Sequence, residues 1–512
     1  MAKLVAVGPE PLERADVVAV ARAGARVELT DQAYRVMATS REHVEALASD
    51  PLPHYGISTG FGALASRYVP VHQRARMQQA VVRSHAAGAG PEVETEVVRA
   101  MALLRLRTLA TGRTGMRPAT AATLAATLNA GLTPVVPEHG SLGCSGDLAP
   151  LAAVALALTG EGMVRDSAGQ LYPADAALRT AGITPVVLAE KEGLALINGT
   201  DGMLGMLVLA TTDLRVLLDS ADVTAAMSLE ALLGTDAVLA RDLIALRPHP
   251  GQAVSAARMR AVLAGSQIVA SHQDPAADTR VQDAYSLRCA PQVHGAARDS
   301  LTHAETVADR ELAAEIDNPV VLPDGRVEST GNFHGAPLAY VLDFLTIPVA
   351  DLASMAERRT DRLLDPARSH GLPPFLAGTP GVDSGYMIAH YTQAALVAEL
   401  KRIAVPASVD SIPTSAMQED HVSMGWAAAR KLRRALPSLA SVLGIELLTA
   451  ARALALRAPL RPAPTTAAVV AALREAGVGA PGPDRHLAPE IEIATEFVRT
   501  GGLLAVVEGI AP

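Results

Sequence analysis

Apolar residues recur at helical spacing along most of this chain. Runs with an apolar residue every three to four positions cover 204–218, 225–233, 336–364, 386–407 and 424–457. Pro437, inside the last run, predicts a kink. Segments rich in Pro and Gly, such as 247–251 and 371–385, separate the runs. The pattern predicts a mainly α fold built as a long-helix bundle.

Strand signals are few. A short alternation of apolar and polar residues predicts a strand at 26–29, and a second signal covers 320–327 around the turn Pro323-Asp324-Gly325. We find no internal repeat and no low-complexity tract in the sequence. A soft boundary near residue 200 divides the chain into an N-terminal region, 1–200, and a long-helix region, 201–512.

Composition narrows the class of protein. Of 512 residues, 49% are hydrophobic but only 3% are aromatic, so Ala, Leu and Val must fill the core, which suits close-packed helices. The net charge of −9 gives no sign of a basic face for nucleic acid. Two cysteines exclude a disulfide framework and indicate a reducing compartment. The N-terminus lacks a signal-peptide pattern and the apolar stretch 148–159 is too short to span a bilayer, so we expect a cytoplasmic protein without membrane partners.

The segment 140–152 is the most informative for chemistry. Gly143-Cys144-Ser145 suggests a nucleophile elbow, but that motif requires a Gly where Asp147 stands. A phosphate-binding loop would end in Lys followed by Ser or Thr, and these residues are absent from the segment. A plain glycine-rich turn before a buried helix is the simpler alternative.

This segment closely resembles the signature of the aromatic amino acid ammonia-lyases. In that family an Ala-Ser-Gly triplet cyclises and dehydrates to 4-methylidene-imidazol-5-one (MIO). Cys144-Ser145-Gly146 occupies the place of the triplet, with Cys for Ala. Only the backbone and Cβ of the first residue would enter the ring, so we expect the change to be tolerated. The resemblance implies a fumarase/aspartase-like helical fold, and a homotetramer whose active sites are assembled from several subunits.

The chemistry explains these residue types. The nitrogen of Gly146 must attack the carbonyl carbon of Cys144, and glycine offers no Cβ to obstruct the approach. Ser145 must lose its hydroxyl as water to leave an electrophilic methylidene. The segment 147–158 is typical of a helix start, and a helix N-terminus favours developing negative charge.

A second glycine-rich segment runs from Tyr55 to Gly62, with three glycines in the last seven residues. By itself it predicts a turn or mobile loop. It resembles the family's Tyr loop, which implies that Tyr55 is the catalytic base. A phenol titrates near ~10, so it needs an electropositive, dry pocket to act as a base.

Two polar residues bear on substrate choice. His85, in Ser84-His85, stands where phenylalanine enzymes tend to carry Phe-Leu and tyrosine enzymes His-Leu, and the pair resembles the histidine-specific form. Glu419 matches the carboxylate that contacts the imidazole in those enzymes. Taken alone, His85 would be a structural histidine and Glu419 part of a solvated acidic pair. The resemblance implies L-histidine as the substrate.

The remaining candidates would hold substrate and cofactor. Asn198 follows an apolar run and matches the family's Asn that contacts both, although an Asn-Gly pair is usually a turn. If 281–289 is helical, Gln282, Tyr285 and Arg288 lie three apart on one face, which alone would indicate an exposed amphipathic helix. Arg288 suits bidentate capture of the substrate carboxylate. The resemblance places Gln282 with the substrate, Tyr285 among the catalytic residues and Phe333 beside the MIO, where the alternative is a core Phe.

Two positions depart from the family pattern. Asp201 stands where Gln is common, and Met417 where Asn is frequent. The first leaves the hydrogen bonding behind Asn198 open.

The motifs follow the family order from residue 55 to 421, and together they imply deamination of L-histidine to trans-urocanate and ammonia. In that reaction Tyr55 takes the β-proton while Arg288 and Asn198 hold the carboxylate. Attack on the MIO by the amine is preferred, and attack by the imidazole ring stays open. A phenylalanine or tyrosine lyase, an aminomutase, and a non-catalytic helical scaffold are the alternatives. We expect no metal site, because neither His-Glu-x-x-His nor Cys-x-x-Cys occurs.

Overall fold

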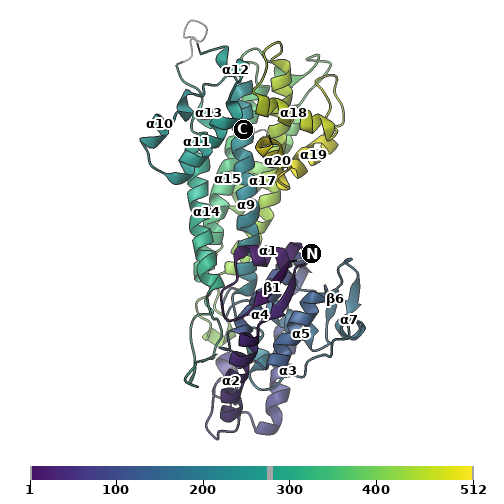
Figure 1. Cartoon of the computed structure of the whole chain (residues 1–512), viewed down its shortest axis with the longest axis vertical. Coiled ribbons are helices and arrows are strands. Elements are labelled where there is room, and N and C mark those ends of the chain that lie inside the picture. The colour runs from purple at the N-terminus through teal and green to yellow at the C-terminus, as the bar shows by residue number, and fades with distance from the viewer. Residues whose placement is uncertain (1–2, 274–280, 510–512) are drawn as a thin grey trace. The chain divides into compact units, whose positions relative to one another are not determined.

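The computed structural model describes residues 3–273 and 281–509, and it is mainly helical, which confirms the predicted fold class (Figure 1). The chain forms two compact units. The first unit comprises Met1–Leu209, Glu305–Leu342 and Ala407–Arg430, and the second comprises Ala210–Ala304, Asp343–Pro406 and Lys431–Pro512. Each unit combines separated segments, and the division into consecutive regions near residue 200 stays a prediction.

The first unit is built around a fully buried helix. Its own helices are α1 (Arg14–Arg22), α2 (Asp31–Ala48), α3 (Arg74–His85), α4 (Thr95–Ala110), α5 (Pro118–Asn129), α6 (Leu148–Leu158), α7 (Ala174–Thr180) and α8 (Glu192–Ala195). Every residue of α4 from Val97 to Ala110 is buried, and α1, α2, α5 and α6 contact it. Ala, Leu, Met and Arg are good helix formers, which explains why this stretch is helical. Gly112, with φ +72°, follows its end in the left-handed conformation typical of helix termini.

Small sheets complete the first unit. Strands β1 (Leu4–Val7) and β2 (Arg26–Leu29) pair in parallel, and β2 confirms the strand predicted at 26–29. Strands β8 (Val320–Val321) and β9 (Val327–Glu328) form the second predicted feature, a hairpin. The other strands are β3 (Ala89–Glu92), β4 (Thr133–Pro134), β5 (Pro137–His139), β6 (Met163–Arg165) and β7 (Leu171–Pro173).

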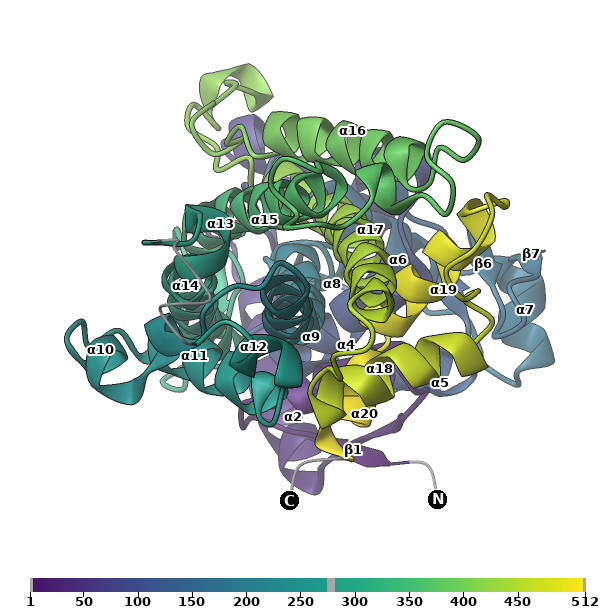
Figure 2. The ribbon, with the colours of Figure 1, turned by 90° about the horizontal axis from the view of Figure 1, so that it is seen from above.

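Four long helices contribute residues to both units: α9 (Asp201–Ala231), α14 (Ala290–Leu312), α15 (Ala336–Leu364) and α17 (Gly425–Leu456). In the second unit they run side by side (Figure 2). Glu446 of α17, fully buried there, accepts hydrogen bonds from Thr224 and Ser228 of α9 and from Arg359 of α15. Buried carboxylates require such partners, so Glu446 joins three helices.

Shorter helices surround this bundle in the second unit. They are α10 (Arg241–Ala245), α11 (Pro250–Leu263), α12 (Gln267–Ala270), α13 (Tyr285–Arg288), α16 (Met387–Ile403), α18 (Pro464–Glu475), α19 (Ala488–Arg499) and α20 (Gly502–Glu508).

The helical spacing predicted three of the four long helices, α9, α15 and α17, but no predicted run covered α14. Helices α15, α16 and α17 confirm three predicted runs, and Pro437 lies inside α17. The two runs predicted at 204–218 and 225–233 form the single helix α9. Asp222 lies between the two runs and interrupts the apolar pattern, but it is buried and paired with His294 and Arg298 of α14. A paired buried carboxylate therefore continues the helix where the sequence suggested a break.

Helices α15 and α17 are long and apolar enough to cross a membrane by length and composition. However, 61% of the most apolar window of α15 and 83% of that of α17 are buried inside the structure. Burial of this kind is typical of core helices.

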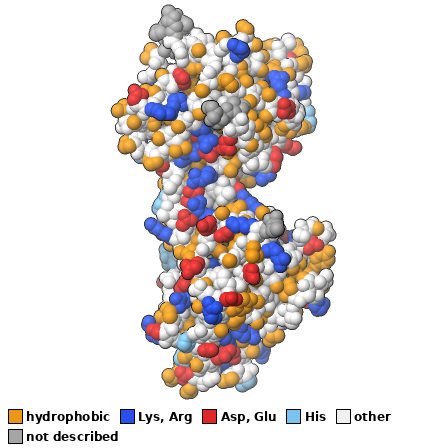
Figure 3. All heavy atoms as spheres, in the orientation of Figure 1, with side chains coloured by type: hydrophobic (Ala, Val, Ile, Leu, Met, Phe, Trp, Pro, Cys, Tyr) orange, Lys and Arg blue, Asp and Glu red, His pale blue; other side chains and the backbone are white. Residues whose placement is uncertain are grey.

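On the face drawn in Figure 3, acidic and basic side chains are interspersed.

Candidate active site

The Cys144-Ser145-Gly146 triplet lies in the first unit, just before α6. Cys144 and Gly146 are buried, whereas Ser145 is partly exposed. The backbone before the triplet is held by distant segments. The carbonyl of Gly143 accepts hydrogen bonds from the Gly335 N–H and the Ser423 hydroxyl, each at 2.9 Å, and the Met424 N–H donates to the Leu142 carbonyl. The triplet is thus fixed at its N-terminal side and remains reachable at Ser145.

The surroundings of Gly146 fit a triplet that must cyclise. Gly146 has φ +76°, and a Cβ there would lie 2.2 Å from the carbonyl oxygen of Gly199. The next N–H, of Asp147, donates to the same oxygen at 2.7 Å. Burial raises the pKa of the Cys144 thiol to about 11, so this thiol is neutral at pH 7. Both observations fit MIO formation, which requires a glycine at the third position and no reaction of the first side chain.

Asp147 connects the triplet to the start of α9. Its Oδ2 accepts hydrogen bonds from the N–H groups of Gly202 and Met203, both at 2.9 Å, and the Ser141 hydroxyl donates to Oδ1. The residue is fully buried, and burial raises its pKa to about 7. Helix α6 begins directly after it, which confirms the helix start predicted at this position.

Asn198 is held by both its backbone and its side chain. Its carbonyl accepts a hydrogen bond from Arg105 at 3.1 Å, and its Nδ2 donates to the carbonyl of Asn318. The remaining side-chain atom, Oδ1, is buried without a hydrogen-bond partner among the described residues. A buried acceptor of this kind is costly unless a ligand satisfies it.

The Tyr55 loop is packed against its surroundings. The Tyr55 hydroxyl accepts a hydrogen bond from the Gly62 N–H at 3.2 Å, and the Phe61 ring meets the Tyr55 ring edge to face. Gly56 has φ +73°, and a Cβ there would touch Leu194 and Pro319. Glycine at position 56 therefore lets the Tyr55 loop pack closely against Leu194 and Pro319.

The turn that carries Glu419 touches the Tyr55 loop. Ser415 Oγ lies 3.2 Å from the position of a Cβ on Gly62. Ser415, Ala416 and Met417 have φ of 51°, 51° and 69°, a left-handed conformation that costs each such residue about 1–2 kcal/mol. Thr414 and Glu419 close this turn: their backbones pair, and the Thr414 hydroxyl donates to the Glu419 carboxylate at 3.2 Å.

His85 is the last residue of α3, and its Nδ1 lies 3.2 Å from the Ser84 hydroxyl. Burial lowers the pKa of its imidazole, while the backbone of Val81 and the carboxylate of Glu419 oppose that shift. Glu419 also raises the pKa of Cys144. Its charge therefore acts on both His85 and Cys144, and all three residues belong to the first unit.

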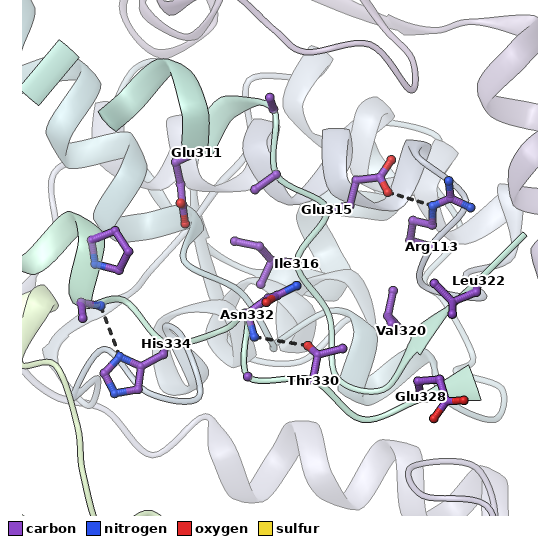
Figure 4. A pocket seen from close by; sticks show the side chains of 15 residues that line it. Arg113, Glu311, Glu315, Ile316, Val320, Leu322, Glu328, Thr330, Asn332 and His334 are labelled. Carbon is purple, nitrogen blue, oxygen red and sulfur yellow. Dashed lines mark hydrogen bonds and ion pairs between the residues drawn. The ribbon is translucent and has the colours of Figure 1, made fainter. Parts of the chain in front are cut away.

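Phe333 is half-buried in the loop between Gly331 and Gly335, whose N–H holds the triplet. The next residue, His334, stacks on His421 with ring centroids 5.5 Å apart. His334 also lines a hollow of about 920 Å³, together with Glu311, Asn332 and others (Figure 4). Among the described residues, the lining of this hollow does not include the triplet.

The other three predicted site residues belong to the second unit. Helix α13 begins only at Tyr285, so Gln282 precedes it and the predicted helical face shared by Gln282, Tyr285 and Arg288 is wrong. The Arg288 guanidinium lies over the Tyr285 ring at 4.8 Å. The Tyr285 side chain is 70% exposed, and Arg288 Nε is buried without a hydrogen-bond partner among the described residues.

Sequence reasoning missed the residues that support the site. Arg105, in α4, pairs with Asp201 and donates to the backbone around Asn198. Thr414 holds Glu419. The only sequence signal for Arg105 is its place, with Arg99 and Arg107, among the apolar residues of α4, since a charged side chain must find a partner when it is buried.

Comparison with known protein families gives a match over most of the chain. Residues 12–475 match the family described as aromatic amino acid lyase. The chain therefore belongs to the aromatic amino acid lyase family, whose members are carbon–nitrogen lyases that generally depend on MIO. The predicted family is confirmed.

Individual relatives cover nearly the whole chain. A histidine ammonia-lyase of Streptomyces coelicolor is 65% identical over 506 residues, covering 99% of this chain and 98% of the relative. The crystal structure of histidine ammonia-lyase from Trypanosoma cruzi matches with a TM-score of 0.90 and 37% identity, over 99% of this chain and 96% of that one. A tyrosine aminomutase from Streptomyces globisporus matches with a TM-score of 0.92 and 37% identity, over 99% and 98%.

Proposed function

We propose that this protein deaminates L-histidine to trans-urocanate and ammonia, using an MIO group formed from Cys144-Ser145-Gly146. The observation that carries the proposal is that the Glu419 carboxylate acts electrostatically on both His85 and Cys144, opposing the lowered pKa of the first and raising the pKa of the second. His85 and Glu419 are polar groups suited to an imidazole. The 65% identity to a histidine ammonia-lyase supports the same substrate.

Formation of the group uses only the chain's own atoms. The Gly146 nitrogen bonds to the Cys144 carbonyl carbon, and the carbonyl oxygen leaves as water with the N–H hydrogens of Gly146 and Ser145, so that a C=N bond forms between that carbon and the Ser145 nitrogen. Ser145 then loses its Cα hydrogen and its hydroxyl as a second water. The fixed Gly143 carbonyl and the contact of Gly146 with Gly199 favour this compact geometry.

The residues around the triplet have separate roles in the proposed reaction. When formed, the MIO supplies an electrophile that makes the substrate amine a better leaving group. Tyr55 takes the β-proton, while Asn198 and Arg288 bind the carboxylate and fix the pose. Arg288 offers a planar guanidinium for this purpose, and its Nε–H has no hydrogen-bond partner in the part of the chain that the structure describes.

The imidazole ring is selected by polar groups. His85 and Glu419 provide a donor and an acceptor for it, and Thr414 keeps Glu419 in place. Phe333 packs beside the MIO. Gln282 and Tyr285 complete the substrate-binding and catalytic sets.

We propose that the active protein is a homotetramer in the cytoplasm, with each site assembled from several chains. The supporting observation is the division of the candidates: eight lie in the first unit, whereas Gln282, Tyr285 and Arg288 lie in the second. The exposed Tyr285 side chain is available to another copy of the chain. The proposal involves no metal, nucleic acid or membrane.

A tyrosine or phenylalanine lyase, or an aminomutase, is the second candidate. The match to a tyrosine aminomutase structure favours it. His85 and Glu419 speak against it, because an apolar ring would leave both groups desolvated and unpaired, at a cost of about 1–3 kcal/mol each.

The deciding experiment measures product absorbance when the purified protein meets L-histidine, L-phenylalanine or L-tyrosine in parallel. We expect urocanate from histidine, and a preference over phenylalanine of roughly 10⁴-fold or more in kcat/KM. Higher kcat/KM for phenylalanine or tyrosine would replace the proposal with the second candidate. No turnover of any of the three amino acids, together with an intact-protein mass equal to the encoded mass, would support the non-catalytic scaffold.

A further inference from the structure

Arg105 of α4 is the most completely engaged buried arginine near the triplet. Its side chain is 1% exposed and that of its partner Asp201 is 5% exposed. Nε and Nη2 of Arg105 both donate to Oδ2 of Asp201, at 3.0 and 2.6 Å. Nη1 donates to the carbonyls of Ala195 and Asn198, at 3.0 and 3.1 Å. One guanidinium thus ties the start of α9 to the backbone of Asn198.

The guanidinium also lies directly against Gly199. A Cβ on Gly199 would be 1.8 Å from Nη2 of Arg105 and 2.5 Å from Oδ2 of Asp201, so no side chain fits there. The carbonyl of Gly199 meets the position of a Cβ on Gly146 and accepts the Asp147 N–H. Asp201, Arg105, Gly199 and the triplet therefore form one unbroken line of contacts.

The geometry suits a rigid support. The guanidinium is planar and its donors are fixed in direction, so its contacts with Asp201 and with the carbonyls of Ala195, Asn198 and Ile316 determine where those groups lie. Each partner belongs to a segment that also touches the proposed chemistry. Asn198 carries the unpaired Oδ1 acceptor, and Gly199 contacts the triplet.

We propose that Arg105 and Asp201 are positioning residues, which hold Asn198 and Gly199 in register with the triplet and thereby support both MIO formation and substrate alignment. The inference rests on the proposed function. Neither residue touches the reacting atoms; both act through the backbone that they hold.

The test compares three variants with a matched control on the same helix. Arg105→Lys keeps the charge but loses the planar fork, Asp201→Ala removes the acceptor, and Asp201→Asn keeps an oxygen that can accept both hydrogen bonds. Arg99→Lys is the control, because Arg99 is also buried in α4 and donates to backbone carbonyls, but those of Val20 and Leu128. For each protein, intact mass gives the fraction of chains that lack two waters, and kcat and KM are normalised to that fraction.

We expect Arg105→Lys and Asp201→Ala to leave part of the chains at the full encoded mass, without loss of the two waters. For the chains that have lost both waters, kcat should fall by about 10²-fold. Asp201→Asn should restore the full mass deficit and a kcat within about threefold of wild type, because the acceptor geometry is kept. Arg99→Lys should change thermal stability but neither the mass nor kcat.

The inference is overturned if Arg105→Lys and Asp201→Ala match the Arg99→Lys control in mass deficit and kcat, or if Asp201→Asn fails as badly as Asp201→Ala. Should Asp201→Ala be insoluble, Arg105→Lys against Arg99→Lys decides. A wild-type protein without the mass deficit or urocanate formation would defeat the proposed function instead, so the two failures are distinguishable.

Discussion

The two units hold their candidate site residues in opposite ways. In the first unit, Cys144, Gly146 and Asn198 are buried, and hydrogen bonds from segments far apart in sequence hold the backbone around them. In the second unit, Tyr285 is 70% exposed, and Arg288 stacks on it with an Nε that has no hydrogen-bond partner among the described residues.

This difference indicates which part of the proposed reaction each unit serves. Formation of an MIO needs a compact, fixed backbone, and the first unit provides it without help. Binding of a carboxylate needs a cation with an available donor, and in the second unit the half-buried Arg288 has a buried Nε without a hydrogen-bond partner among the described residues. A site that uses both therefore favours association of chains, since an exposed residue can complete the pocket of a neighbour.

The largest expected effect in the first unit is that of Ser145→Ala, which removes the hydroxyl that must leave as water when the MIO forms. Cyclisation and dehydration each release one water, so wild type should fall short of the encoded mass by two waters, and the variant should not show this deficit. Nearly all activity should be lost while the helical circular dichroism is kept. An active preparation of wild type with the full encoded mass contradicts the expectation.

Tyr55→Phe tests the base in the first unit. The change removes one hydroxyl, whose observed partner is the Gly62 N–H, so stability should change little. General base catalysis contributes roughly 10²–10⁴-fold, and kcat should fall on that scale. The two-water deficit should persist, because Tyr55 contributes no atom to the triplet. Near-normal kcat would mean that another group takes the proton.

His85→Leu and Glu419→Gln test ring selection. Each change removes or neutralises one polar partner of the imidazole, so kcat/KM for histidine should fall about 10–10²-fold. His85→Leu should also narrow the gap to phenylalanine, since one desolvated polar group is gone. Glu419→Gln should leave the mass deficit unchanged. Equal kcat/KM for histidine in wild type and both variants would remove these residues from the substrate site.

Much of this site could be predicted from sequence because its signals are local. The spacing of apolar residues is read within one segment, so α15 and β2 have the predicted bounds. The triplet and Asn198 stand in short motifs. Arg105 could not be paired with Asp201, since 96 residues separate them and nothing local links the two. The split of the candidates between two units likewise depends on tertiary contacts.

A mixing experiment sharpens the role of the second unit. Ser145→Ala disables the first unit and Arg288→Met the second, and each variant alone should be nearly inactive. If each site combines units from different chains, co-expressed variants should regain activity, and random association predicts about a quarter of the wild-type value. Separately purified and unmixed variants are the control. No recovery in co-purified hybrid oligomers would mean that each site uses a single chain.

The smallest expected effect contrasts two fully buried carboxyls. Burial raises the pKa of Asp147 to about 7, and its hydrogen-bond partners carry no charge. Burial also acts to raise the pKa of Asp222, but His294 and Arg298 outweigh it and hold the pKa below its usual value. An unfolded Asp titrates near ~4. The stability that Asp147 contributes is therefore complete below pH ~4 and is lost as pH rises through about 7, whereas that of Asp222 is present above pH ~4 and is lost on acidification.

Thermal midpoints from pH 5 to 8 measure this contrast. Wild type should lose stability relative to Asp147→Asn over that range, by up to ~1.4 kcal/mol per pH unit, because the unfolded carboxyl ionises while the buried one keeps its proton up to about pH 7. The gap between wild type and Asp222→Asn should stay constant there and shrink only at lower pH. Parallel curves for wild type and Asp147→Asn would mean that Asp147 is already ionised at pH 5, held by the N–H groups at the start of α9. The buried carboxyl beside the triplet would then resemble its counterpart in the second unit.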